Sequence, residues 1–215
     1  MTTADIDGCD PAPLLVVPVG SCEQHGPHLP LHTDTVIAEA LARRLVERRG
    51  DCVLAPPITI TASAEHAGFA GTLSIGTEVM AATVVELVRS AGWASGVVFV
   101  NGHGGNVLAM DRAARALADQ SPATLVWWPS VPDGDLHAGR TETSLMLALA
   151  PELVRPERAV AGPTPTLAEL VEHGVAALSG SGVLGDPSGA TAEEGRRLMA
   201  KLADQLVDAV VAWAG

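Results

Sequence analysis

The chain has 215 residues, of which 47% are hydrophobic, and its mean hydropathy is +0.27. This composition excludes intrinsic disorder, which combines low hydrophobicity with high net charge, and the length matches one large α/β domain. The 25 acidic and 13 basic residues give a net charge of −12. A nucleic-acid partner is therefore disfavoured, because phosphate binding needs clustered Lys and Arg. Tyrosine is absent, so no tyrosine hydroxyl can serve in catalysis.

Three further features of the sequence bear on the cellular location of the protein and on the redox state of its cysteines. The longest apolar runs, 14–19 and 97–100, are far shorter than the roughly 20 residues of a membrane-spanning helix. The first ten residues are acidic where a secretory signal is basic. We therefore expect a cytoplasmic protein with no membrane partner, in which residues 1–12 are flexible. The cysteines Cys9, Cys22 and Cys52 form no C-x-x-C motif, which predicts free thiols rather than disulfides.

The apolar pattern predicts strands alternating with helices in a single domain, 1–215. Short apolar runs predict strands at 14–19, 52–60, 96–100 and 123–128. The second of these is an edge or broken strand because it contains Pro56 and Pro57. Amphipathic spacing predicts helices at 34–49, 77–91, 107–120, 166–178 and from 191 onward. Thr77 is expected to cap its helix, and capping boxes are expected at 166–169 and 191–194.

This alternation, with strands apolar on both faces, predicts an α/β fold with a mainly parallel sheet between helices. Ligands of such sheets bind outside the carboxyl ends of the strands. The segment after the first predicted strand carries two carboxylates and three imidazoles within twelve residues: Glu23, His25, His28, His32 and Asp34. Two prolines exclude a helix interior there, so Glu23 and His25 point to the same side of an extended segment. They could bind one ion or two adjacent ions.

The segment after the third strand places His103 among three glycines, in the sequence Asn-Gly-His-Gly-Gly-Asn. A phosphate-binding loop is the rival interpretation, because Gly-rich turns bind anions at helix N-termini. It has little support, since no G-x-x-x-x-G-K-[ST] motif is present and Lys201 is the only lysine.

The segment after the fourth strand adds His137 and Glu142 at a predicted helix start. Three clusters of His and carboxylate residues, each following a strand, converge at one edge of a parallel sheet. Nitrogen and oxygen donors without thiolate favour zinc, iron or manganese. The side chains that suffice for a dinuclear site are Glu23, His25, Asp34, His103 and Glu142.

Other catalytic arrangements fit the sequence less well. There is no G-x-S-x-G elbow, no H-E-x-x-H helix and no cysteine in an evident His-paired motif. A polar segment that includes Glu65 and His66 follows the second strand and could line the pocket. The Gly-, Ser- and Pro-rich stretch Gly180 to Gly189 is expected to be a surface or active-site loop.

Together these motifs resemble the creatininase (creatinine amidohydrolase) family of metal-dependent amidohydrolases. The resemblance rests on Glu-x-His-Gly-x-His-Leu-Pro from Glu23, an Asp nine residues after His25, Asn-Gly-His-Gly-Gly-Asn from Asn101 and His-Ala-Gly-x-x-Glu-Thr-Ser from His137. The stretch from Ser63 to Glu78 and the Gly-Val-Leu-Gly-Asp-Pro run are similar to a peptide-cleaving branch of the family. The resemblance covers the chain from about Leu14 to Gly189.

This resemblance implies a creatininase-like three-layer sandwich that forms a homo-oligomer, a hexamer or similar. It implies two divalent metal ions per subunit, zinc, iron or manganese, bound by Glu23, His25, Asp34 and His103, with Asp34 shared. It also implies a catalytic role for His137 near the scissile carbonyl. Gly105 stands where creatininase has a metal-binding glutamate, so creatinine hydrolysis is in doubt and Glu142 is suggested as the replacement ligand or proton carrier.

The leading hypothesis is a metal-dependent peptidase that hydrolyses one amide bond near the C-terminus of a modified precursor peptide. The metal ions would polarise the carbonyl and activate water, and His137 would donate to the developing oxyanion. The residues expected to bind substrate are Glu65, His66 and Asn101. The alternatives are an amidohydrolase of a small cyclic amide or formamide, and a non-catalytic metal-binding assembly protein.

Overall fold

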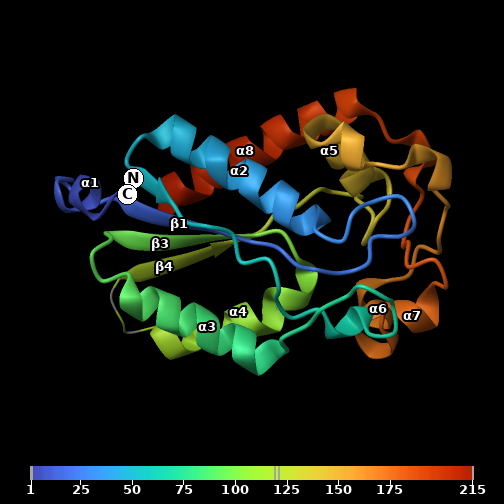
Figure 1. The fold of residues 1–215 in the computed structure, drawn as a ribbon, viewed down its shortest axis with the longest axis horizontal. Coiled ribbons are helices and arrows are strands. Elements are labelled where there is room, and N and C mark those ends of the chain that lie inside the picture. Colours follow the sequence, from blue (N-terminus) through green and yellow to red (C-terminus); the bar gives the residue numbers. More distant parts are fainter. Residues whose placement is uncertain (1, 119, 121, 215) are drawn as a thin grey trace.

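The computed structural model describes residues 2–118, 120 and 122–214 and contains the predicted parallel sheet (Figure 1). Its four strands are β1 Leu14–Val19, β2 Cys52–Leu54, β3 Gly96–Asn101 and β4 Ala123–Trp127. They pair in parallel in the order β2-β1-β3-β4, and Leu14 lies opposite both Cys52 and Gly96. Strand β2 is an edge strand, as predicted, but it ends before Pro56. The chain then keeps one further bridge to the sheet, between Ile58 and Val19.

Helices cover both faces of this sheet and make a three-layer sandwich (Figure 1). One layer contains α2 Thr33–Arg49, α5 Arg140–Leu149 and α8 Ala192–Ala214, and the other contains α3 Thr77–Ser90 and α4 Val107–Leu117. Alternate strand residues enter the two cores, with Val16 and Val98 on the α2 side and Val17 and Phe99 on the α3 side. Because both faces are buried, the central strands are apolar throughout. The predicted α/β three-layer fold is confirmed.

The ends of the helices follow local rules that the sequence shows only in part. Helix α2 ends at Gly50, whose φ of 76° is accessible to glycine at low cost. Thr77 does not cap α3, because the N-cap residue is Gly76 and no side chain caps that helix. The 166–169 capping box is present, whereas at 191–194 only half of the box forms. The Thr191 hydroxyl accepts from Glu194 N, but the Glu194 carboxylate binds other side chains.

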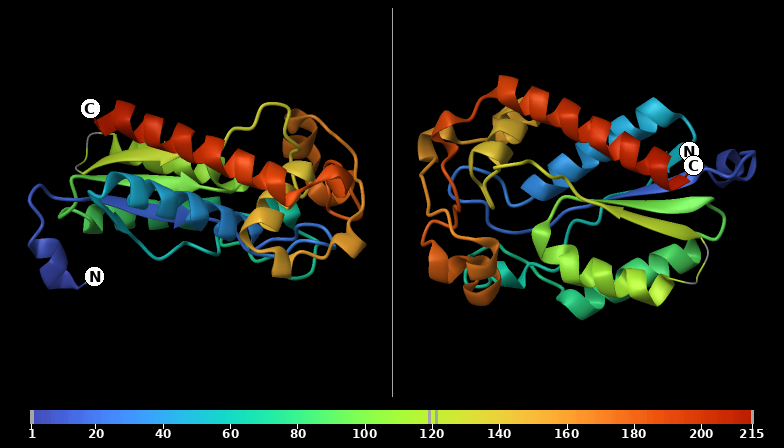
Figure 2. Two further views of the ribbon diagram at one scale, coloured as in Figure 1. Left: turned by 90° about the horizontal axis from the view of Figure 1, so that it is seen from above. Right: turned by 180° about the vertical axis from the view of Figure 1, so that it is seen from behind.

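Short helices gather around the carboxyl ends of the strands (Figures 1 and 2). The predicted helix 166–178 is broken at Gly174, which has a φ of 72°, into α6 Leu167–His173 and α7 Val175–Leu178. Among the residues that the structure describes, 3-10 helices occur at Ala64–His66, Gly104–Asn106, Pro151–Leu153, Pro156–Arg158 and Pro187–Gly189. Helices α6 and α7 pack on the first of these, which places them beside the expected site.

The N-terminal segment contains one short helix, α1 Thr3–Asp7, which is closed by a capping box between Thr2 and Asp5 and buries none of its residues. Within the described residues, none of the helices is both long enough and apolar enough to cross a membrane.

Candidate metal centre

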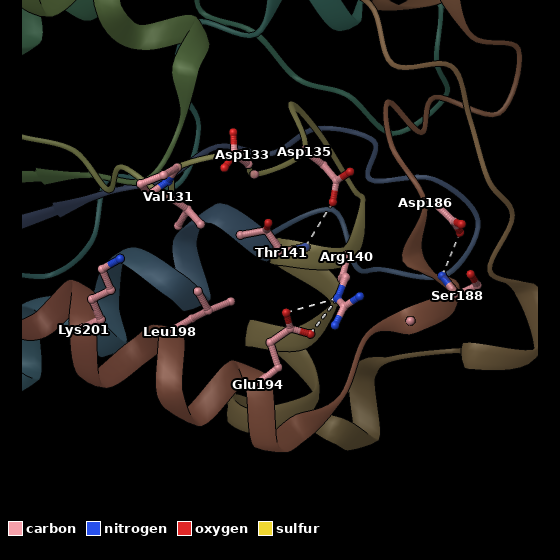
Figure 3. Close-up of a pocket in the computed structure, with 13 residues that line it drawn as sticks. Val131, Asp133, Asp135, Arg140, Thr141, Asp186, Ser188, Glu194, Leu198 and Lys201 are labelled. Carbon is pink, nitrogen blue, oxygen red and sulfur yellow. Dashed lines mark hydrogen bonds and ion pairs between the residues drawn. The ribbon is translucent and has the colours of Figure 1, made fainter.

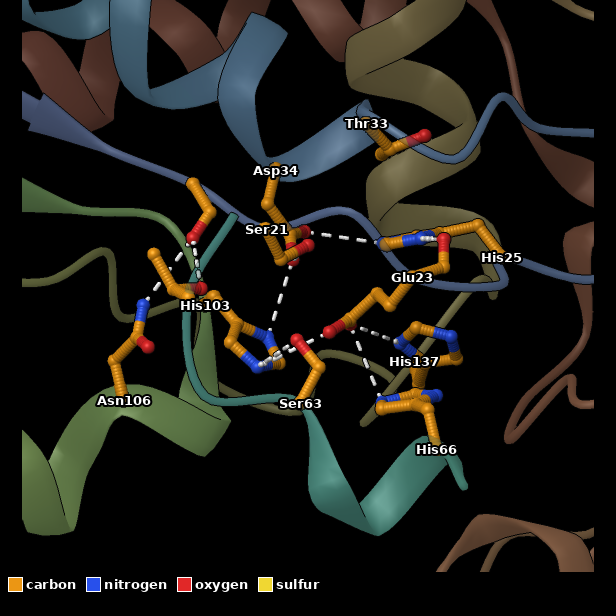
Figure 4. Close-up of polar contacts among 12 residues, drawn as sticks. Ser21, Glu23, His25, Thr33, Asp34, Ser63, His66, His103, Asn106 and His137 are labelled. Atoms are coloured by element: carbon orange, nitrogen blue, oxygen red, sulfur yellow. Dashed lines mark hydrogen bonds and ion pairs between the residues drawn. The ribbon is translucent and has the colours of Figure 1, made fainter. Parts of the chain in front are cut away.

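The predicted donors come together at the carboxyl edge of the sheet (Figure 4). Glu23 and His25 follow β1, Asp34 lies in the first turn of α2, and His103 follows β3. His137 and Glu142 come from the segment that leads into α5 and from its first turn. Glu23, His25, Asp34, His103 and His137 are at most 6% exposed. Ionisable side chains are rarely buried unless they are paired or bind a metal.

Asp34 is the centre of this cluster. Its Oδ1 lies 3.1 Å from His25 Nε2, and its Oδ2 lies 3.2 Å from His103 Nδ1. The Ser21 hydroxyl donates to Oδ2 at 2.7 Å. The two carboxylate oxygens therefore face two different histidines, as a bridging ligand between two ions requires.

Glu23 lies on the other side of His103. Its Oε2 is 3.0 Å from His103 Nε2, and its Oε1 is 3.2 Å from His66 Nε2 and 3.9 Å from His137 Nδ1. Both oxygens are buried, and neither accepts a hydrogen bond of good geometry from the described residues. Such a carboxylate is costly to bury. A divalent cation would satisfy both oxygens, so this side chain fits a metal ligand.

Main-chain carbonyl groups determine how three histidine rings are oriented. His25 Nδ1 lies 3.2 Å from Glu23 O, His103 Nε2 lies 2.9 Å from Ala62 O, and His137 Nε2 lies 2.7 Å from Gln24 O. Because a carbonyl oxygen only accepts, each of these ring nitrogens carries a proton. When such a ring is neutral, its other nitrogen presents a lone pair to the cluster, which is the arrangement of metal-binding histidines with an oriented ring.

This assignment bears on the role predicted for His137. A neutral ring that carries its proton on Nε2 has no proton on Nδ1, the nitrogen that lies nearer Glu23. Burial lowers the pKa of His137 well below the usual value, and neighbouring His25 lowers it further, so the ring is neutral near pH 7. The neutral ring is therefore placed to accept a proton or bind a cation through Nδ1, and the predicted donation from His137 to an oxyanion stays a prediction.

The charges in the cluster are strongly coupled. Burial alone would lower the pKa of His25, but Asp34, with smaller effects of Glu142 and Glu23, raises it to about 10. Burial alone would raise the pKa of Asp34, but His25 and His103 hold it well below the usual range. For Glu142, burial raises the pKa to about 7. In the metal-free protein, protons therefore occupy positions that a metal ion would take.

Two donor groups fit two ions. Glu23, Asp34 and His103 offer ligand atoms that lie within 4.8 Å of one another, and so do His25, His137 and Glu142. A third such group, Glu23, His66 and His137, shares a residue with each of these two. Asp34 joins the groups, because it lies beside both His25 and His103. Oxygen and imidazole nitrogen donors suit zinc, manganese and iron.

Glu142 lies where a replacement ligand would be needed. Its Oε2 is 3.8 Å from His25 Nε2 and accepts a hydrogen bond from Ala138 N at 2.6 Å. Gly105 has no room for a side chain, because a Cβ there would overlap Glu65 Oε1 and His103 Nε2. The structure thus fills the volume beside Gly105 with Glu65, whose Oε1 is 3.2 Å from His103 Nε2.

Glu65 and His66 line the same cavity as the donors, as expected for residues that meet substrate. Asn101 does not line it and is placed elsewhere. Its Nδ2 donates to His103 O at 2.8 Å, and its Oδ1 accepts from Asn106 Nδ2 at 3.0 Å. Asn101 therefore uses its amide to hold the loop that carries His103, and the structure gives no support to its predicted role in substrate binding.

Two histidines of the first motif lie outside the donor groups. His28 Nε2 is 2.9 Å from the Thr143 hydroxyl, which links the loop after β1 to α5. His32 occupies the N-cap position of α2, where its side chain makes no capping hydrogen bond. Gln24, to which no role is assigned from the sequence, contacts both His66 and His137. Its position between two predicted ligands was the only available signal.

The cavity above the donors has a volume of about 880 Å³, within the size range of small-molecule sites. The apolar part of its lining is formed by Leu108, Trp128, Leu136, Leu167 and Val171. Each of these five side chains is partly exposed. Among the described residues, no Lys or Arg lines the cavity.

A second cavity, of about 600 Å³, lies between the 131–135 loop and α8 (Figure 3). It contains none of the predicted site residues. Arg140 pairs with Glu194 at 2.8 Å, and Asp135 accepts from Thr141 N at 3.3 Å. These contacts tie the start of α5 to α8 and to the preceding loop.

Comparisons with known proteins agree with this geometry. The family model described as creatinine amidohydrolase matches residues 1–210. The mycofactocin precursor peptide peptidase of Mycolicibacterium smegmatis (strain ATCC 700084 / mc(2)155) is 50% identical over 212 residues, which cover 94% of this chain and 85% of that protein. A manganese form of creatininase is 28% identical with a TM-score of 0.79, covering 96% of this chain and 92% of that one. A Zn–Zn type of a mutant creatininase is 28% identical with a TM-score of 0.77, covering 92% and 89%. This chain belongs to the creatinine amidohydrolase (creatininase) family.

Proposed function

We propose that the protein is a metal-dependent peptidase that cleaves an amide bond near the C-terminus of the radical-modified mycofactocin precursor peptide and releases a small Val–Tyr-derived lactam. The observation that carries this proposal is the pair of donor groups, joined by Asp34, at the floor of an apolar-walled cavity. The half-identical relative supports the substrate, since its name states that it is a peptidase of this precursor.

The cavity suits such a product. Its volume of about 880 Å³ can hold a lactam with an aromatic substituent. Leu108, Leu136 and Val171 offer apolar contacts to the valine- and tyrosine-derived parts of that group. Beside the proposed metal ligands, the carboxylates that line the cavity are Glu65 and Asp111, and among the described residues no Lys or Arg is placed there to pair with an anionic group. An uncharged end of a peptide is therefore the ligand that the lining favours.

The residues divide between metal binding and proton transfer. Glu23, Asp34 and His103 would hold one divalent ion, and His25, Asp34 and Glu142 would hold the other, with zinc, iron and manganese as the candidates. Bound there, the ions would supply Lewis acidity to the amide carbonyl and lower the pKa of the attacking water. His137 Nδ1 is the proton acceptor of the site, because Gln24 O holds the ring proton on Nε2. Protonated His137 then returns that proton to the leaving amine nitrogen.

The test combines elemental analysis of protein purified without chelator with mass spectrometry of the modified precursor peptide after incubation with it. We expect two ions per chain and cleavage next to the modified end, with the unmodified peptide as the matched control substrate. Bound metal without cleavage of the modified peptide would refute the peptidase, and a panel of small cyclic amides and formamides would then identify the alternative hydrolase. Absence of metal, with no binding of zinc, iron or manganese, would refute the metal centre.

A further inference from the structure

We propose that Gln24 is a positioning residue that fixes His66 as the neutral hydrogen-bond donor of this site, and that His66 Nε2–H binds the carbonyl oxygen of the scissile amide. The second part of this inference rests on the proposed amide hydrolysis. The first part rests only on hydrogen bonds inside the protein.

The orientation of the Gln24 side-chain amide is determined by two main-chain groups. Gly26 N–H donates to Gln24 Oε1 at 2.9 Å, and Gln24 Nε2 donates to Gly182 O at 3.1 Å. A main-chain N–H can only donate and a carbonyl can only accept, so the oxygen and the nitrogen of this amide cannot be exchanged. Gln24 is 5% exposed, which leaves no competing contact with bulk water.

The second N–H of the Gln24 amide sets the protonation of His66. Gln24 Nε2 is 2.9 Å from His66 Nδ1. Gln24 Nε2 also lies 3.1 Å from His137 Nε2, but that ring nitrogen donates to Gln24 O at 2.7 Å, so it cannot accept from the amide as well. The two amide N–H groups are left for Gly182 O and His66 Nδ1, so His66 Nδ1 is the acceptor and its ring proton lies on Nε2. A doubly protonated ring is disfavoured as well, since it would place two N–H groups opposite each other. His66 Nε2 lies 3.2 Å from Glu23 Oε1 without a hydrogen bond of good geometry, and His66 lines the cavity.

Gln24 also determines which nitrogen of His137 faces the site with a lone pair, and there the result is a proton acceptor instead of a donor. The main-chain oxygen of Gln24 accepts from His137 Nε2 at 2.7 Å, so His137 presents a lone pair on Nδ1. The His66 and His137 rings have centroids 4.4 Å apart. One residue therefore places a hydrogen-bond donor beside a proton acceptor, which is what amide hydrolysis needs at the carbonyl oxygen and at the attacking water.

A distant loop holds Gln24 in this position. Gly182 has a φ of 81°, and a Cβ on it would overlap the Gln24 side-chain amide. Leu184 N donates to His137 O at 2.9 Å, so the loop after Gly182 also fixes the segment that carries His137. This contact explains why the Gly-rich 180–189 stretch belongs to the site although none of its residues is a metal-donor candidate.

The test replaces the Gln24 side chain by one of nearly the same shape that accepts hydrogen bonds where the amide nitrogen donates them. In the Gln24→Glu variant, the group that faces His66 Nδ1 becomes an acceptor, so the ring proton should move to Nδ1. We expect kcat on the modified precursor peptide to fall by about 10²- to 10³-fold, the loss that accompanies removal of one oxyanion donor. KM should change much less. The matched control is Gln205→Glu on α8, which makes the same chemical change outside the site and should leave kcat unchanged.

Histidine-selective 15N spectra of the zinc-loaded protein report the ring protonation directly. In the wild type, the His66 signal should show a proton on Nε2, and the Gln24→Glu variant should move it to Nδ1. The His66→Gln variant identifies the signal by its loss, and it keeps an N–H donor, so kcat should stay within about tenfold of the wild type. The His66→Met variant lacks the donor and should lose the full 10²- to 10³-fold.

The outcomes separate this inference from the proposed function. A proton on His66 Nδ1 in the wild type would overturn the role of Gln24, whether or not the peptide is cleaved. A proton on Nε2 together with full kcat in His66→Met would overturn the role of His66 as carbonyl donor. If the variants with altered Gln24 do not fold, the wild-type spectrum and the two His66 variants still decide both points. Failure of the wild type to cleave the peptide, with the Nε2 proton observed, would refute the substrate and leave the Gln24 assignment supported.

Discussion

The Asp34→Asn substitution should weaken the binding of both metal ions at once. It keeps the shape of a side chain that lies 3.1 Å from His25 Nε2 and 3.2 Å from His103 Nδ1. It replaces one carboxylate oxygen by an N–H donor and removes the negative charge. Because the two oxygens face different donor groups, neither ion can keep its full ligand set.

The expected magnitude follows from the number of ligands. If the three protein ligands of an ion and one water share roughly 12 kcal/mol of zinc binding, one ligand contributes about 3 kcal/mol. At 1.4 kcal/mol per factor of ten, this corresponds to an increase of about 100-fold in the Kd of each ion. The loss of activity should be larger than either change in affinity, since hydrolysis needs both ions.

Competition with a chromophoric zinc chelator measures both affinities, and elemental analysis after dialysis gives the number of ions retained. The matched control is Asp204→Asn, which makes the same substitution at an exposed residue of α8 that pairs with Arg48; its zinc affinity should equal that of the wild type. Two ions bound with wild-type affinity in Asp34→Asn would refute the bridging role. Loss of one ion alone would show that Asp34 serves a single site.

Three further predictions concern protons, space and packing. At pH 7 zinc binding should release protons, because the pKa of His25 is raised to about 10 in the metal-free protein and the pKa of His103 is raised as well. The apparent zinc affinity should therefore rise with pH through the neutral range. Calorimetry in buffers of different ionisation enthalpy measures the released protons, and a heat of binding that does not depend on the buffer would contradict this prediction. Gly105→Ala should lower zinc occupancy, because its Cβ would overlap His103 Nε2, whereas Gly104→Ala, with open space around its Cβ, should bind zinc normally; equal occupancy in the two variants would argue against the packing described here. Leu41→Ala, at a fully buried position on α2, should lower the free energy of unfolding by about 2–5 kcal/mol, and a denaturant midpoint equal to that of the wild type would contradict its place in the core.

The sequence was sufficient for the architecture and for the location of the site. Uninterrupted apolar runs such as 14–19 indicate strands covered on both faces, and their alternation with amphipathic segments restricts the sheet to parallel pairing. Parallel strands end at one edge, so the polar residues that follow them must meet there. Glu23, His25, Asp34 and His103 could be brought together on this basis alone.

Details that depend on contacts between distant segments could not be predicted in this way. Spacing along the chain does not show whether the Asn101 amide faces the cavity or its own loop, and the structure shows that it binds His103 O and Asn106. The capping box at Thr191 failed for a similar reason, because the Glu194 carboxylate binds Arg140 from α5. In both cases a tertiary partner competes with a local one.

The residue types and their order along the chain determined a parallel α/β sandwich with a cluster of nitrogen and oxygen donors at one edge. Only the tertiary structure decided what each histidine contributes. The proton of His137 is placed by Gln24 O, and that of His66 is placed by a Gln24 amide that Gly182 holds from 158 residues away. A histidine in a sequence can donate or accept at either nitrogen, and the choice between these states is made by whichever group the fold brings against each side of the ring.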